Sequence, residues 1–278
     1  MRLIAQTKGT GLDSATQTVS TLIIALALVL TIVGTQIARR RKARNARVGQ
    51  AGSIFPLRPI AAYETIPQIV GGAIESDRPV HLSFGSAGVG GVTTVLALAA
   101  ADAFYQIARR TVTGSVTPLI TLSDPTALML GYGSLQRAFR ERDRLARLKR
   151  GNVHWYPAGG RSLAFAAALT GAASNARASG DILIGSFGME LALILDGSRR
   201  RRAASIAASD QLEGQAIAWV MATHPLIGEE VFLASAYLGD RSSDAGALLA
   251  LDTLRWLIII GLIAAAALLL RDALGVGI

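Results

Sequence analysis

VHLSFGSAGVGGVTTVLALAAADAFYQIARR, residues 80–110, contains three successive patterns that together predict one structural unit. Residues 80–85 form a short, mostly apolar run, which is typical of a buried strand. From residue 92 to residue 110, apolar residues and alanines recur at helical spacing. A glycine-rich loop, residues 85–91, joins the two patterns. The segment therefore predicts a strand, a tight loop and a helix.

This unit recurs along residues 61–244. Short apolar runs predict further strands at 116–123, 153–156, 182–187 and 204–208, and helical patterns lie between them, at 61–74, 92–110, 124–150, 162–175, 190–195 and 211–238. Asp124 is expected to cap the third helix, with Pro125 at its first position, and His224-Pro225 is expected to break the last one. The alternation predicts an α/β fold with a mainly parallel sheet and flanking helices, in the manner of a Rossmann domain.

An uncharged segment precedes this body. Residues 14–38 contain no charged side chain, and residues 22–37, LIIALALVLTIVGTQI, are almost wholly apolar. Roughly 20 such residues cross a bilayer as a helix. Six basic residues follow at once: Arg39, Arg40, Arg41, Lys42, Arg44 and Arg47. The positive-inside rule places them, and the body, in the cytoplasm. A cleaved secretory signal, the alternative, requires its positive charge before the apolar core.

A second apolar run, residues 256–270, WLIIIGLIAAAALLL, lies between Arg255 and Arg271. Both arginines can extend toward the headgroups, and Trp256 suits the membrane interface. A second span is the prediction, with a buried core helix or a re-entrant segment as alternatives. The expected organisation is a tail and first span at 1–38, a basic linker at 39–60, a cytoplasmic α/β domain at 61–244, and a second span with a short tail at 245–278.

Composition excludes several classes of chemistry. The chain has no cysteine, so a disulfide, a thiolate metal site and a thiol nucleophile are impossible. The net charge is +9. Because basic residues cluster beside the first apolar run, lipid headgroups explain this charge better than nucleic acid does. The block Arg199 to Arg202 has no interleaved aromatic residues and is interpreted as a solvated turn or a membrane-surface contact.

Four short blocks give residues 78–238 a family resemblance. They are Arg78-Pro79-Val80-His81 with Ser83 and Gly85, Asp124-Pro125, Gly185-Ser186-Phe187-Gly188 with Glu190, and Ile227-Gly228-Glu229-Glu230 with Phe232 and Ala236-Tyr237-Leu238. In these blocks the chain resembles an uncharacterised family of bacterial membrane proteins, in which an α/β body follows an N-terminal membrane helix. The resemblance implies this fold and topology, and it implies no activity.

The glycine-rich loop is the first candidate ligand site. Backbone N–H groups at a strand-to-helix turn can bind phosphate, which makes Gly85, Ser86, Gly88 and Gly90 candidate residues. The loop lacks the lysine of a phosphate-binding loop and does not complete the dinucleotide fingerprint. A structural interpretation, in which the glycines permit a tight turn and close packing, is therefore favoured over anion binding.

Polar residues at other strand ends extend this candidate site. Asp124 follows the second predicted strand, and Ser186 and Glu190 follow the fourth; α/β folds place ligands at such strand ends. The segment around Ser186 falls one position short of a nucleophile elbow, so a serine hydrolase is not favoured.

The remaining titratable residues give no catalytic or metal-binding pattern. Glu229 and Glu230 are neighbours and would point about 100° apart on a helix, so they are interpreted as charges at a helix N-terminus. His81, His154 and His224 are far apart in sequence, and the first two fall in predicted strands. We expect no metal, no cofactor and no catalytic residue.

Two functions from different classes fit these patterns. The first is a non-catalytic scaffold or assembly module in the inner (plasma) membrane, with the lipid bilayer, further copies of itself and other membrane proteins as partners. The second is a regulatory membrane protein that binds a nucleotide or another anion at residues 85–91. An enzyme is third.

Overall fold

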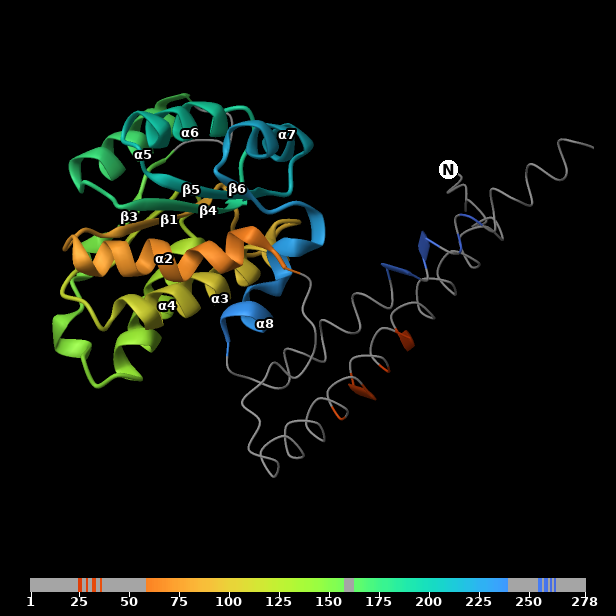
Figure 1. Ribbon diagram of the computed structural model, residues 1–278, viewed down its shortest axis with the longest axis horizontal. Helices are drawn as coiled ribbons and strands as arrows, with labels where there is room; N and C mark the ends of the chain where they lie inside the picture. Colours follow the sequence, from red (N-terminus) through yellow and green to blue (C-terminus); the bar gives the residue numbers. More distant parts are fainter. Residues whose placement is uncertain are drawn as a thin grey trace, which may run out of the picture. The chain divides into compact units, whose positions relative to one another are not determined.

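A six-stranded parallel sheet forms the centre of the domain (Figure 1). The computed structural model describes residues 59–157 and 163–239, with a few helical positions between 25 and 36 and between 255 and 263. The strands are β1 (Val80–Gly85), β2 (Leu119–Leu122), β3 (Val153–Trp155), β4 (Gly180–Ser186), β5 (Ala204–Ser209) and β6 (His224–Pro225). Their order is β3-β2-β1-β4-β5-β6, and every pair is parallel. The predicted α/β fold is thereby confirmed.

Helices cover both faces of the sheet, which gives three layers (Figure 1). One face carries α2 (Ala61–Glu75), α3 (Thr94–Thr111), α4 (Ala127–Arg140) and α8 (Ala234–Leu238); the other carries α5 (Leu163–Asn175), α6 (Leu191–Arg200) and α7 (Leu212–Met221). Three short 3-10 turns, η1 (Leu145–Arg147), η2 (Arg150–Asn152) and η3 (Gly228–Leu233), complete the described elements.

Apolar side chains fill both interfaces between sheet and helices. Phe84 on β1 meets Phe104 on α3 edge to face, with ring centroids 4.7 Å apart, in an arrangement that aromatic pairs favour. On the other face, Phe165, Leu183 and Phe187 belong to a buried cluster that joins β4 and β5 to α5, α6 and α7. Because both faces are covered, β1, β2 and β4 are buried along their whole length, as expected of a parallel sheet.

Four helices end in the same way, and glycine is absent from the position where it is usual. Asp77, Asp143, Arg177 and Arg202 adopt φ of 52–57° after α2, α4, α5 and α6. In each case the next residue donates its N–H to a carbonyl five residues back, as Arg144 does to Phe139 at 2.9 Å. This is the hydrogen bond that closes a Schellman motif.

Several predicted boundaries were wrong. The helix expected to continue to residue 150 ends at Arg140, because Asp143 enters the left-handed region. The strand expected at 116–123 is only Leu119–Leu122; Pro118 has no N–H for the ladder. The helix expected at 211–238 is α7, β6, η3 and α8 in succession. The break predicted at His224-Pro225 is confirmed, because α7 ends at Met221, and these two residues form an edge strand that pairs with β5.

The two predicted membrane spans, residues 22–37 and 256–270, lie mostly outside the described residues. Within the part of the chain that the structure describes, no helix combines the length and the apolar character that crossing a membrane requires.

The junction of β1 and β4 depends on a glycine. A Cβ on Gly185 would lie 1.9 Å from the carbonyl oxygen of Phe84. We therefore expect Gly185→Ala to lower the free energy of unfolding by about 2–3 kcal/mol, because the strands must separate. Urea unfolding of the full chain in mild detergent, followed by circular dichroism, measures this.

Gly171 provides the matched control. It lies inside α5, and a Cβ there would meet nothing within 4 Å. Gly171→Ala should stabilise the domain by about 0.5–1 kcal/mol, since alanine loses less backbone entropy in a helix. Equal effects of the two substitutions would show that the β1–β4 contact is not the constraint.

Candidate functional site

The candidate residues lie where the chain direction across the sheet reverses. From β1 the strand order runs outward to β2 and β3 on one side and to β4, β5 and β6 on the other. The helices that follow β1 and β4 cover opposite faces of the sheet (Figure 1). Open α/β sheets bind ligands at this switch point, beyond the carboxyl ends of the strands. We call this side of the domain the carboxyl edge, and the opposite side the amino edge.

Ser86 and Ser186 meet at the switch point. The N–H and the hydroxyl of Ser86 both donate to the carbonyl oxygen of Ser186, at 2.9 and 3.0 Å. The Ser186 hydroxyl accepts a hydrogen bond from Gln211 Nε2 at 3.0 Å and is 3% exposed. Gln211 was not among the predicted residues, and only its position directly after a strand end signalled it. The only described partner of the Ser186 hydroxyl is the side-chain amide of Gln211, which is not a base. Among the described residues, no general base is therefore in place to activate this hydroxyl as a nucleophile.

Gly88 and Asp124 form a second contact. A Cβ on Gly88 would lie 2.3 Å from Asp124 Cγ, so a larger residue would displace this carboxylate. Asp124 Oδ1 accepts hydrogen bonds from the N–H and the hydroxyl of Thr126, at 2.8 and 2.5 Å. The prediction that Asp124 is the N-cap was wrong by two residues: the helix begins at Ala127, and Asp124 instead fixes the turn before it.

Threonine hydroxyls accept hydrogen bonds from the N–H groups of the glycine-rich loop. Gly88 donates to Thr93 Oγ1 at 3.2 Å, and Val89 donates to Thr126 Oγ1 at 2.7 Å. Gly90 and Gly91 both donate to Thr94 Oγ1, at 2.9 and 3.1 Å. A phosphate would need these same donors, and it would face the Asp124 carboxylate. The geometry favours the structural interpretation of the loop, and anion binding there stays a prediction.

Glu190 is buried against the same edge. It is 2% exposed, and its Oε1 accepts the N–H of Gly188 at 2.7 Å. Its Oε2 is buried and meets no hydrogen-bond donor among the described protein atoms. The structure therefore places Glu190 beside Gly188 and Gln211. The other predicted residues form two separate contacts. Gly85 and Ser86 contact Ser186, and Gly88 contacts Asp124.

A buried charge network crosses the sheet near its amino edge. His81 Nδ1 donates to Asp181 Oδ1 at 2.8 Å, and His81 Nε2 lies 2.9 Å from Thr121 Oγ1. Arg201 donates to the other oxygen of Asp181. Carboxylate, imidazole and hydroxyl in this order resemble a hydrolase relay, but His81, Asp181 and Thr121 are each 0% exposed. No substrate reaches them, so the network holds β1, β2, β4 and α6 together.

The Asp181 carboxyl stays ionised because of its partners. Burial favours its neutral form, but the hydrogen bond and charge of His81, with the Arg201 guanidinium, hold its pKa below the ordinary value. The prediction that His81 is a hydrogen-bonded strand histidine fits this contact. Asp181 and Arg201 were missed, because they lie 100 and 120 positions from His81 and no local pattern links them.

The other candidates have structural roles. Glu229 and Glu230 lie in the first turn of η3, as predicted, and the Glu230 carboxylate accepts the N–H of Ile227 at 3.2 Å. His154 stacks on Tyr156, and His224 Nε2 lies 3.2 Å from Thr65 Oγ1. Within residues 59–157 and 163–239, no group of three acidic or histidine side chains is arranged to hold a metal ion.

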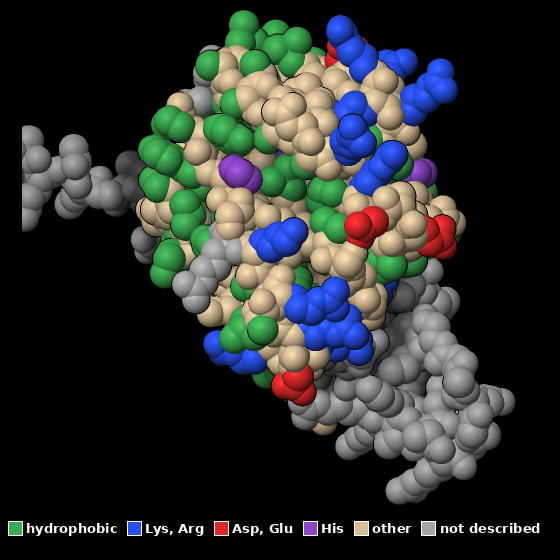
Figure 2. Space-filling model, turned by 90° about the vertical axis from the view of Figure 1, so that its left-hand side faces the viewer, with side chains coloured by type: hydrophobic (Ala, Val, Ile, Leu, Met, Phe, Trp, Pro, Cys, Tyr) green, Lys and Arg blue, Asp and Glu red, His purple; other side chains and the backbone are tan. Residues whose placement is uncertain are grey.

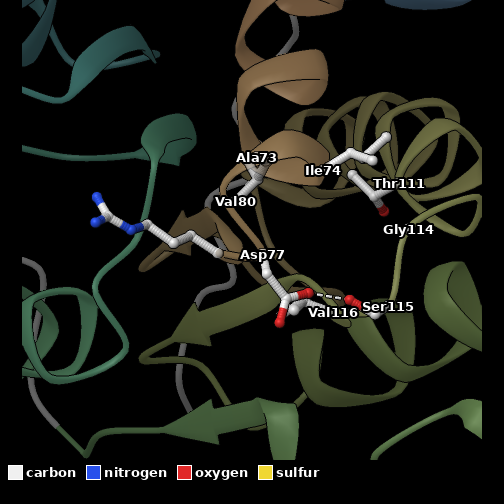
Figure 3. Close-up of a pocket in the computed structure, with 9 residues that line it drawn as sticks. Ala73, Ile74, Asp77, Val80, Thr111, Gly114, Ser115 and Val116 are labelled. Atoms are coloured by element: carbon white, nitrogen blue, oxygen red, sulfur yellow. Dashed lines mark hydrogen bonds between the residues drawn. The ribbon is translucent and has the colours of Figure 1, made fainter.

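The described cavities do not coincide with these residues. A cavity of about 10 Å³ lies at the amino edge, lined by Ala73, Val80 and Thr111 and closed by the Ser115 to Asp77 hydrogen bond (Figure 3). It has room for about one water molecule. A hollow of about 410 Å³ lies between α5 and α6, and one of about 290 Å³ between α3 and α4. Both hollows are on the outer faces of helices.

Large, exposed apolar side chains follow the strands at the carboxyl edge. Each of the first five strands is followed by an exposed one, in chain order Val92, Met129, Leu163, Met189 and Leu212, with exposed fractions of 67–100%. We call these five residues the apolar ring.

These features define an α/β domain with doubly wound strand order, in which exposed apolar residues follow the strands at the carboxyl edge. The chain belongs to the family described as a domain of unknown function (DUF6754), whose family model matches residues 14–274. This agrees with the resemblance to an uncharacterised family seen in the sequence. No curated protein and no solved structure gives a match.

Removal of the Asp181 charge should destabilise the domain. We expect Asp181→Asn to cost about 3–5 kcal/mol, because His81 and Arg201 lose their buried partner. The folded-state pKa lies below that of an unfolded aspartate, about 3.9, so the stabilisation is present above that pH and disappears as the pH falls through the folded-state pKa. Urea unfolding between pH 7 and pH 3 measures both effects.

Asp196→Asn is the control for this substitution. Asp196 pairs with Arg200 one turn away on α6, and its side chain is 44% exposed. Its removal should change stability by less than about 0.5 kcal/mol. An Asp181→Asn protein as stable as this control would contradict the structural role of the network.

Proposed function

We propose that this chain is a membrane-anchored, non-catalytic assembly module whose α/β body self-associates on the cytoplasmic side of the inner membrane. The apolar ring is the observation that carries this proposal. Val92 is fully exposed and Leu212 is 83% exposed. Exposed apolar side chains cost free energy in water, and groups of them are typical of protein contacts.

The composition of the helices supports close contact between bodies. The sequences ALALAAADA in α3 and AFAAALTGAAS in α5 are rich in small residues, which allow helices to approach each other. α7 adds exposed Leu212, Trp219 and Val220 on an outward-facing stripe. The hydroxyls of Ser186 and Thr121 are both engaged in hydrogen bonds or buried contacts, so a nucleophile is not apparent among the described candidates.

The membrane part of the proposal rests on the sequence. Residues 22–37 and 256–270 are apolar, and the basic cluster at 39–47 favours a cytoplasmic body. The described positions Leu26, Val29, Ile32 and Val33 are helical and 42–54% exposed, and exposed apolar helix surface of this kind suits a lipid environment.

Anion binding at residues 85–91 is the second candidate. The strand order and the position of the loop after β1 favour it, because nucleotide-binding α/β domains use both. The threonine hydroxyls on Gly88, Val89, Gly90 and Gly91 and the nearby Asp124 carboxylate count against it. Self-association is the stronger proposal, since the apolar ring has no role in anion binding.

The full chain, purified in mild detergent, should be a homo-oligomer in native mass spectrometry. Leu212→Lys should shift it toward monomer, because a charge in the apolar ring cannot be buried without a partner. Gln68→Lys is the control: Gln68 is exposed in the middle of α2, away from the ring. A monomeric wild-type chain would contradict self-association.

A tag inserted at the described surface turn after β5, between Asp210 and Gln211, reports the topology. Protease added to intact cells should leave the tag uncut, and it should cut the tag once the cells are lysed. The positive-inside rule is the reason for this expectation. Cleavage on intact cells would place the body outside and overturn the predicted orientation.

A further inference from the structure

Among the described residues, the amino edge carries the basic side chains together with the acidic Glu75, Asp77, Glu141 and Asp143, so its net charge is positive. Every Lys and Arg in residues 59–157 and 163–239 lies in the last turn of an α-helix or in the segment between that helix and the next strand. These positions are all at the amino edge. Figure 2, which views the domain from the side where α2 ends, shows basic side chains spread over this face and few acidic ones.

The carboxyl edge has the opposite charge. Asp124, Asp210 and Glu213 follow β2 and β5 there, next to Met129 and Leu212 of the apolar ring. Among the described residues, this edge carries no Lys or Arg. Asp210 and Glu213 are exposed, so their charges are available to a partner.

We infer that copies of this chain associate head to tail, with the carboxyl edge of one body on the amino edge of the next. This inference rests on the proposed self-association and identifies its two surfaces. Opposite charges meet in this arrangement, which guides the encounter and sets the orientation. The two alternatives, carboxyl edge on carboxyl edge or amino edge on amino edge, bring like charges together and are unfavourable.

The amino edge also offers apolar contacts to the ring. Trp219 and Val220, in the last turn of α7, are 70% and 78% exposed, and Leu145 in η1 is 41% exposed. A contact between the edges can therefore combine an apolar centre with a charged rim, the composition found in protein interfaces.

A head-to-tail contact uses two different surfaces, one from each copy. Each copy keeps one unused edge after a dimer forms, so association continues until a ring closes or a filament grows. Substitution at either edge alone must then break the assembly.

Two charge-reversed variants of the full chain test this arrangement. The amino-edge variant is Arg142→Glu with Arg199→Glu, and the carboxyl-edge variant is Asp210→Lys with Glu213→Lys; all four residues are exposed. Each variant alone should be monomeric in native mass spectrometry, at concentrations at which the wild type is oligomeric. An equimolar mixture should associate again, because the unchanged carboxyl edge of the amino-edge variant can bind the unchanged amino edge of the carboxyl-edge variant.

Gln68→Lys is the control. Gln68 is exposed in the middle of α2 and lies at neither edge, so this variant should assemble as the wild type does. For the wild type, an increase in NaCl from 50 to 500 mM should weaken association about tenfold or more, since salt screens exposed charges.

The outcomes separate this inference from the proposed function. A monomeric wild type would end both. An oligomeric wild type whose amino-edge variant or carboxyl-edge variant still assembles would retain self-association and overturn the head-to-tail arrangement, because a symmetric contact needs only one of the edges. Monomeric variants that stay monomeric when mixed would also overturn it.

Discussion

The close approach of β1 and β4 is the constraint on which the rest of the domain depends. These strands are neighbours in the sheet but are separated by about a hundred residues of chain. Gly185 leaves room for the Phe84 carbonyl, and the His81 and Asp181 side chains pair across the same two strands. Because the chain reverses its direction across the sheet here, this junction also fixes which face each helix covers.

The same junction explains why the glycines of the candidate site are required. Gly85 has φ of 58°, and a Cβ on it would lie 2.3 Å from the Ser186 carbonyl. Gly88 makes room for Asp124. The glycines thus bring three strand ends together, and the hydroxyls of Thr93, Thr94 and Thr126 accept hydrogen bonds from N–H groups of the loop. The loop has the position of a phosphate-binding loop and the hydrogen bonding of a structural one.

Local patterns predicted most of the strands and helices, whereas contacts between distant segments were not predictable. Apolar runs located β1 and β5 to within one residue, because buried parallel strands are short and continuous. The end of α4 was missed because Asp143 occupies the left-handed position where a glycine would have given a signal. Gly85 and Asp124 were found from their places after strands. Asp181, Arg201 and Gln211 were missed, since their roles depend on neighbours that only the folded sheet provides.

The division of charge follows from the architecture and has a consequence for contact. In a doubly wound domain, the C-termini of the helices that lead into strands point toward the amino edge, and the helix dipoles favour Arg and Lys there. The N-termini of these helices point toward the carboxyl edge, and the dipoles favour Asp and Glu there. Dipoles therefore contribute to the sign of each edge, as at the arginines in the last turns of α3, α4 and α6 and at Glu213 in the first turn of α7. They do not account for the apolar ring, because Val92, Met129 and Leu212 gain nothing from a dipole and are costly in water. The carboxyl edge therefore combines the apolar ring with negative charge, and the amino edge on the opposite side of the domain has a positive charge. The two edges are complementary, so the carboxyl edge of one copy fits the amino edge of the next.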